Sequence, residues 1–247
     1  MLTLGGHRAV EFPTTRWSLI FAAGRPPADQ SRQAFAALCE AYWRPAYAYV
    51  RRQGCTVEEA QDLVQDFFAH LLEKPVLQRA DPERGRFRAL IRVSLKHFLS
   101  NERSRSRTKK RGAGVLIVLG NLERAESWCR LEPIDHETPD RVYDRRWALT
   151  VLDRVMSHLR AEFVRAGKTT LFDALKPHLT SEAAPSSYPQ LAADLGLSEV
   201  AVRVAVHRLR RRFNAVLHEE IGATVTTPEE VAGEIRYLRA VLSRGRD

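Results

Sequence analysis

The chain has 247 residues, of which 44% are hydrophobic and 28% are charged. This balance excludes an intrinsically disordered protein, and the length is sufficient for one large domain or two small ones, each with its own core. The formal net charge of +9 favours a polyanionic partner. Charge alone leaves three classes of partner open, namely nucleic acids, membrane surfaces and acidic proteins.

The cysteines and the hydropathy pattern indicate a cellular compartment. Cys39, Cys55 and Cys129 lie far apart and show no Cys-x-x-Cys spacing, so we expect buried thiols in a reducing environment. No run approaches the roughly 18 consecutive apolar residues of a membrane helix, and the N-terminal segment lacks the apolar core of a signal peptide. The sequence predicts a cytoplasmic protein without a membrane partner.

Helical periodicity begins at residues 31–53, where Pro45 is expected to bend the helix. The next helix is better specified, because Thr56 is followed by Glu59 at the spacing of a capping box. One face of this second helix is apolar and the other is acidic. The acidic face consists of Asp62, Gln65, Asp66 and Glu73. A solvated surface and a docking surface for a basic partner both explain this face, and spacing alone favours the solvated surface.

A third helix is predicted to begin at Phe87, after a turn-rich loop at 81–86. It combines an apolar face with a basic face and leads into six cations within residues 103–111. Such a density exceeds what a solubilising surface needs, because like charges repel one another unless phosphates neutralise them. The segment therefore indicates contact with a nucleic acid.

Residues 112–139 are rich in glycine and proline and show no sustained amphipathic period, which is typical of a linker. The short apolar run at 115–119 fits a strand or a segment packed on a helix, and the sequence leaves both open. Helical patterns return at 140–166 and 169–179.

The stretch 188–213 contains a short helix, a glycine turn and a longer basic helix. The small Ala192 allows close packing, Gly196 permits the turn, and Ser198 is expected to cap the second helix. Val202, Val206 and Leu209 are predicted to face inward. The outer face and the tail hold Arg203, His207, Arg208, Arg210, Arg211 and Arg212.

This pattern is typical of a helix-turn-helix, in which the second helix lies in the major groove of DNA. Arg203 can reach guanine acceptors or a phosphate, whereas Arg208 and the later arginines are expected to hold the backbone. An amphipathic surface helix is the simpler alternative. The glycine turn and the preceding short helix favour DNA binding.

Two groups of motifs together resemble the extracytoplasmic-function (ECF) class of bacterial RNA polymerase sigma factors. The first group is EEAQDLVQDFFAHLLEK (58–74) followed by RGRFRALIRVSLKHFLSNERSR (84–105), which is similar to region two of the family. The second is YPQLAADLGLSEVAVRVAVHRLRRRF (188–213), which is similar to region four. Both groups in this order are more specific than the helix-turn-helix alone.

The resemblance implies an all-α fold with two helical domains. The first domain would cover 1–111, the linker 112–139, and the second domain 140–247 with the helix-turn-helix and an added C-terminal helix. The implied function is promoter-specific initiation of transcription, with core RNA polymerase and promoter DNA as partners. An anti-sigma factor is a further partner that the resemblance allows.

The resemblance also implies a role for individual residues. The acidic helix would bind the clamp helices of the polymerase largest subunit through Asp62, Leu63, Gln65 and Asp66. Contacts to the melted minus-ten element would come from Arg86, Arg88, Arg92, Lys96, His97, Asn101, Arg103 and Arg105. The minus-thirty-five duplex would be read by Ser198, Arg203, Val204, His207, Arg208 and Arg211. Many relatives have Asn in place of His97 and Asp in place of Asn101, which affects the identity of the flipped base rather than the role.

Unstacked bases need stacking partners, and Phe87, His97 and Phe98 are the candidates, with Phe98 also placed at a core spacing. At the other end of the chain, Thr227 and Glu230 form a second capping box. The helix that follows is expected to pack on the second domain, and we hypothesise a regulatory role from its position.

Three other functions compete with a sigma factor. A standalone helix-turn-helix regulator would not need the acidic helix and would bind a palindrome as a dimer. An enzyme finds little support, because the motifs of metalloproteases, P-loop proteins and serine hydrolases are absent from the sequence. Asp62 and Asp66 could share a magnesium ion, but no third carboxylate is placed to join them. An RNA-binding protein would explain the basic run. We therefore expect a non-enzyme without a metal or a cofactor.

Overall fold

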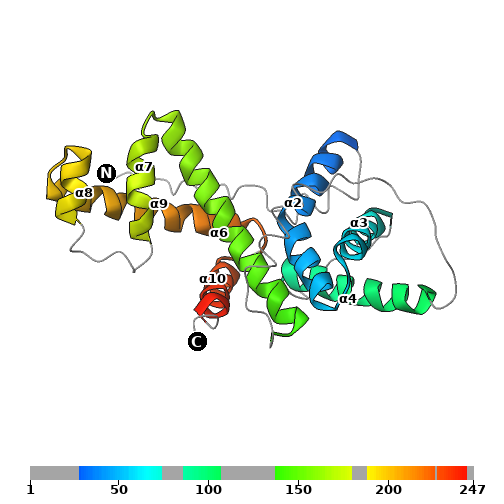
Figure 1. Ribbon diagram of the computed structural model, residues 1–247. Coiled ribbons are helices and arrows are strands. Elements are labelled where there is room, and N and C mark those ends of the chain that lie inside the picture. The colour runs from blue at the N-terminus through cyan, green and yellow to red at the C-terminus, as the bar shows by residue number, and fades with distance from the viewer. Residues whose placement is uncertain (1–27, 74–85, 107–136, 180–187, 226, 244–247) are drawn as a thin grey trace.

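The computed structural model describes residues 28–73, 86–106, 137–179, 188–225 and 227–243 (Figure 1). Within these ranges the chain is helical and contains no β-strand, which confirms the all-α class. In chain order the elements are α2 (Ala28–Arg52), α3 (Val57–Glu73), α4 (Phe87–Ser106), α6 (Pro139–Arg165), α7 (Thr169–Leu175), the 3-10 helix η2 (Lys176–Leu179), α8 (Tyr188–Leu195), α9 (Glu199–Gly222) and α10 (Pro228–Ser243).

Local capping signals in the sequence define where several helices begin. At the start of α3, the Thr56 amide donates to Glu59 at 2.8 Å and the Glu59 amide donates to the Thr56 hydroxyl at 3.2 Å. The same reciprocal pair forms between Thr227 and Glu230 before α10. Both predicted capping boxes are therefore confirmed. The helix α2 continues through Pro45, where the sequence predicts a bend.

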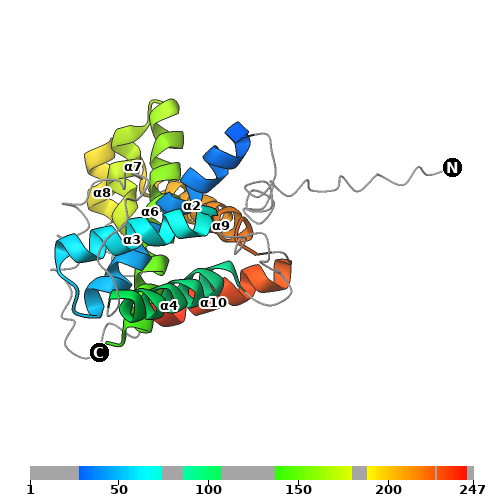
Figure 2. The same cartoon turned by 90° about the vertical axis from the view of Figure 1, so that its right-hand side faces the viewer.

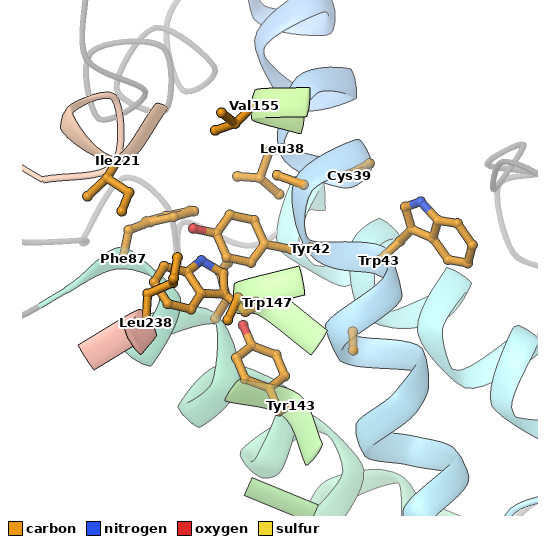
Figure 3. Packing of buried hydrophobic residues seen from close by; sticks show 14 of the residues in the cluster. Leu38, Cys39, Tyr42, Trp43, Phe87, Tyr143, Trp147, Val155, Ile221 and Leu238 are labelled. Carbon is orange, nitrogen blue, oxygen red and sulfur yellow. The ribbon is translucent and has the colours of Figure 1, made fainter. Parts of the chain in front are cut away.

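The centre of the molecule is the contact between α2 and α6 (Figure 1). Figure 3 shows Tyr42 of α2 close to Phe87 of α4 and Trp147 of α6, while Trp43 points to the other side of α2. The rings of Tyr42 and Phe87 meet edge to face with centroids 5.3 Å apart. These aromatic side chains are almost fully buried, so they supply a large share of the apolar area that stabilises the fold.

The helix α6 also packs against α7 and α9, which belong to the second predicted domain. Phe163 of α6 contacts Phe172 of α7 with ring centroids 5.3 Å apart. The helix α9 packs against α6, and α8 lies at the N-terminal end of α9 (Figure 1). One buried cluster includes side chains from both predicted domains. Most of the predicted linker, including residues 115–119, lies outside the described residues. The division into two domains therefore stays a prediction.

The C-terminal helix α10 packs against α6 and α9, through Ile235 and Leu238 among other residues. The view in Figure 2 places α10 behind α4. Glu234 of α10 forms ion pairs with Arg88 of α4 and with Arg86, the residue before α4. The C-terminal segment thus contacts both halves of the chain. The sequence predicts only its contact with the second half.

Candidate nucleic-acid interface

The turn between α8 and α9 has the hydrogen-bond pattern of a Schellman motif. The Leu197 amide donates to the Ala192 carbonyl at 2.9 Å, and the Gly196 amide donates to the Ala193 carbonyl at 3.2 Å. Gly196 has a φ of +62°, a conformation that L-residues with a side chain rarely adopt. The glycine therefore ends α8 and sets the direction in which α9 begins.

The serine after this turn caps α9, as the sequence predicts. The Ser198 hydroxyl accepts a hydrogen bond from the Ala201 amide at 3.2 Å, and Ser198 has the extended backbone of an N-cap residue. Its side-chain oxygen is thus already engaged in capping. Ser198 thereby positions the first turn of α9.

Opposite faces of α9 have opposite environments. Val202, Val206 and Leu209 are buried against the core, as predicted. The exposed face carries the other residues that the resemblance assigns to duplex DNA, namely Arg203, Val204, His207, Arg208 and Arg211. Val200 joins them with 70% of its surface exposed. The structure therefore brings these side chains together on one accessible surface.

Arg203 is held in place on this surface by its own helix. Its Nε donates to the Glu199 carboxylate at 3.1 Å, and both side chains are exposed. An exposed pair at this spacing contributes only about 0.3–0.5 kcal/mol. A guanine edge or a phosphate can therefore replace Glu199 as the partner of Arg203 at little cost.

Two arginines in the middle of α9 have structural contacts instead. Both Nε and Nη2 of Arg210 donate to the His178 carbonyl, at 3.0 and 2.7 Å. Arg212 binds Glu162 of α6 and Glu219 of α9, at 3.0 Å (Nε–Oε2) and 3.1 Å. Arg212 lowers the pKa of the Glu162 carboxyl by its hydrogen bonds and its charge. These two arginines link α9 to η2 and α6. The sequence pattern alone does not predict these contacts.

An apolar groove borders the exposed face of α9 and was not expected from the sequence. Val204 and Arg208 line it from α9, and Phe163 and Leu171 line it from α6 and α7. Its residues come from α6, α7, α9 and the connection between α6 and α7. Only the tertiary packing of these helices creates the groove.

The basic helix α4 divides into two parts. Lys96, His97, Asn101 and Arg103 lie on its exposed surface, and Arg103 donates to the side chain of Gln53, the residue after α2. The side chain of Arg105 lies outside the described residues. The exposed part of α4 therefore retains four of the eight predicted minus-ten residues.

The first turns of α4 have a different environment, which corrects the predicted DNA surface. Only 6% of Arg88 is exposed. Its Nε and Nη2 donate to Glu234 at 2.7 and 3.2 Å, and its Nη1 donates to Asp144 at 3.1 Å. These contacts raise the pKa of the guanidinium although burial acts to lower it. Arg88 is thus part of the interior and not of an open surface.

The neighbours of Arg88 are engaged in the same way. Arg92 pairs with Asp144 at 2.7 Å and with Asp140 at 3.4 Å. Arg86 pairs with Glu234 at 2.7 Å. Arg86, Arg88 and Arg92 therefore all bind carboxylates of the chain itself.

The aromatic candidates for base stacking are corrected as well. Phe87 and Phe98 are buried, at 1% and 6% exposure, and Phe98 packs on the ring of Phe67 with centroids 5.7 Å apart. His97 is exposed. Of the three candidates, only His97 lies where an unstacked base can reach it.

The acidic face of α3 is open to solvent. Asp62 and Asp66 are exposed, whereas Leu63 and Gln65 are half-buried. Partial burial, Asp62 and Glu102 of α4 together raise the pKa of the Asp66 carboxyl. Glu102 extends the acidic surface beyond the single helix that the sequence predicts, because α3 and α4 pack together.

The chain matches no protein-family model, and no curated protein or solved structure matches it. Among the described residues, no helix is both long and apolar enough to cross a membrane. Within the same residues, no group of three or more His, Cys, Asp and Glu side chains is placed to hold a metal ion. Assignment of a function therefore depends on the residues and surfaces of the chain itself.

Proposed function

We propose that the chain is a sigma factor of the ECF type, which binds core RNA polymerase and directs promoter-specific initiation in the cytoplasm. The observation that carries the proposal is a pair of exposed surfaces of opposite charge. The acidic surface contains the exposed Asp62 and Asp66 with the half-buried Glu102 beside them, and the basic surface contains the exposed Arg203 and Arg208. A protein that must dock on another protein and also bind DNA needs two such surfaces.

The basic surface suits duplex DNA. The early residues of α9 are exposed, and the helix is fixed from behind by its buried valines and by the glycine turn. A helix presented in this way can enter the major groove with Arg203 at a base edge. The exposed part of α4, with Lys96, His97 and Asn101, then serves the melted strand.

The acidic surface separates this proposal from its main competitor. A standalone regulator would bind duplex DNA through α9 and would have no use for Asp62 and Asp66. One observation fits that competitor equally well, because α9 presents its basic residues on an exposed face. The two functions differ in whether the chain binds polymerase.

Reconstitution with core RNA polymerase tests the proposal directly. The purified chain is mixed with core enzyme, separated by size and assayed for start-site-specific transcription on the DNA upstream of its own gene. We expect co-elution and specific initiation. Specific duplex binding without co-elution would favour the standalone regulator.

A charge-reversed pair of variants assigns the docking surface. Asp66→Arg should abolish polymerase binding, because it reverses the charge in the centre of the acidic surface. Asp173→Arg is the matched control, since Asp173 is an exposed carboxylate on α7, away from that surface. Equal polymerase affinity in the two variants would rule out the acidic surface as the docking site.

A further inference from the structure

The carboxylate of Glu234 lies between the guanidinium groups of Arg88 in α4 and of Arg86, the residue before α4. Glu234 is 1% exposed. Arg88 binds it with two donors, at 2.7 and 3.2 Å, and Arg86 binds the same carboxylate at 2.7 Å. Guanidinium groups bind carboxylates and phosphates with the same fork-shaped geometry. Glu234 thus occupies the donors that a DNA phosphate would use.

The guanidinium of Arg86 lies against a glycine of α10. A Cβ atom built on Gly233 would lie 2.9 Å from Nη2 of Arg86, a distance that would force the guanidinium to shift. The bare backbone at this position lets the side chain of Arg86 lie across α10 and reach Glu234. Both the carboxylate and the small residue beside it therefore suit the contact between α10 and α4.

Further groups strengthen the hold on Arg88. Asp144 of α6 accepts a hydrogen bond from Nη1 of Arg88, and the Tyr237 hydroxyl donates to Asp144 at 2.6 Å. The Tyr237 ring lies 3.8 Å from the guanidinium carbon, in the range of a cation–π contact. Tyr237 belongs to α10, so the helix contributes both a carboxylate and an aromatic face to one arginine of α4.

The chemistry of the contact between Glu234 and the two arginines allows a phosphate to replace the carboxylate. Glu234 is buried on α10 together with only two apolar residues, Ile235 and Leu238. Its other apolar contacts with the core, from Val231, Tyr237, Val241 and Leu242, are partly exposed. A buried ion pair gives little net stability, because desolvation offsets most of the attraction. When DNA phosphates replace the Glu234 carboxylate, the arginines keep an anionic partner and Glu234 becomes hydrated.

We propose that α10 is an autoinhibitory helix, whose Glu234 competes with DNA for Arg88 of α4 and for Arg86, which directly precedes α4. In the closed form these arginines are neutralised within the chain. Release of α10 exposes them and extends the basic surface of α4 toward its N-terminal end. The inference rests on the proposed function in one respect, which is the assignment of α4 to DNA.

The test compares Glu234→Gln with Glu229→Gln. Glu229 is exposed on the same helix, so both variants remove one negative charge from α10. The probe is a fluorescein-labelled single-stranded DNA oligonucleotide of mixed sequence, and its affinity is measured by anisotropy at fixed salt. We expect Glu234→Gln to bind about fivefold or more tightly than Glu229→Gln, since coupling between sites usually starts at that size. Adding Arg88→Ala to Glu234→Gln should remove the gain. Equal affinities of the folded single variants would overturn the proposal.

Amide hydrogen exchange of the wild-type chain gives a second test that does not depend on a variant folding. Saturating amounts of the same oligonucleotide should reduce the protection of residues 228–243, because DNA displaces α10. Unchanged protection would overturn the autoinhibitory role. Neither experiment contains polymerase, so failed co-elution with polymerase would refute the proposed function and leave these results standing.

Discussion

The helices α4 and α9 look alike in sequence, yet their arginines have different environments. Both combine an apolar face with a basic face. On α9, Arg203 and Arg208 are exposed, whereas on α4, Arg88 is 6% exposed and held by two carboxylates. The carboxylates come from α6 and α10, 56 and 146 residues away in the sequence. A basic pattern therefore identifies a candidate surface, and distant segments decide whether its charges stay free.

Exposed and buried arginines also differ in how much they contribute to the stability of the fold. An exposed pair such as Glu199–Arg203 contributes little to stability, because water already solvates both charges. A buried arginine is costly to remove, since its carboxylates are then left without compensation. The same residue type thus serves binding in α9 and structure in α4, and substitutions separate the two.

The largest effect on stability is expected for Arg88→Ala. The substitution leaves Glu234 and Asp144 in the interior with fewer partners, and we expect a loss of about 3–5 kcal/mol in the free energy of unfolding. Arg203→Ala is the matched control on α9 and should change stability by about 0.5 kcal/mol or less. Urea denaturation followed by circular dichroism measures both. Similar midpoints for the two variants would contradict the assigned role of Arg88.

Arg203→Ala should instead weaken DNA binding. Loss of a base-edge contact costs about 1–3 kcal/mol in affinity for the preferred duplex and relaxes sequence preference at one or two positions. Arg212→Ala is the control, because Arg212 binds Glu162 and Glu219 within the protein. Titration of promoter and random duplexes measures the difference. Equal losses on both duplexes would show that Arg203 reads no base.

Gly196→Ala tests how the turn presents α9. Gly196 has a φ of +62°, and an alanine in this left-handed region costs about 1–2 kcal/mol. We expect a lower thermal midpoint together with weaker duplex binding, since the start of α9 depends on this turn. Ala193→Gly, at an exposed position of α8, should weaken folding without redirecting α9. Wild-type stability of Gly196→Ala would contradict the strained turn.

Asp66→Asn should have the smallest effect on the free energy of unfolding. Unlike the other substitutions, it should raise this free energy. The pKa of Asp66 is raised from 3.8 by partial burial and by the neighbouring Asp62 and Glu102, so its ionised form is disfavoured in the folded state. At neutral pH the amide should stabilise the chain by a few tenths of a kcal/mol. As the pH falls through the raised pKa, the wild-type carboxyl takes up a proton and the advantage of Asn disappears. A stabilisation that stays constant down to acid pH would exclude electrostatic repulsion as its cause.

Local features of this chain were predictable because their partners lie within one turn. The capping box at Thr56 and Glu59, the cap at Ser198 and the inward face at Val202 and Val206 all follow from spacing within a few residues. The residues assigned to α9 by the family resemblance also lie on one exposed face. The environment of a helix face depends on its period, which the sequence shows directly.

Tertiary contacts could not be predicted from the spacing of residues within one helix. The pairing of Arg88 with Glu234, the burial of Phe87 and Phe98, and the addition of Glu102 to the acidic surface all join segments that are distant in sequence or lie on different helices. Nothing in the period of α4 distinguishes a cation that meets solvent from one that meets a carboxylate of α10.

The sequence by itself determined that the chain is helical, where the caps and the glycine turn stand, and which face of α9 carries the cations. It could do so because hydrogen bonding and amphipathic spacing act over a few residues. Only the tertiary structure decided which arginines of α4 remain available and that α10 contacts them. Those outcomes depend on desolvation and on charge pairing between helices, and both are set when distant segments pack together.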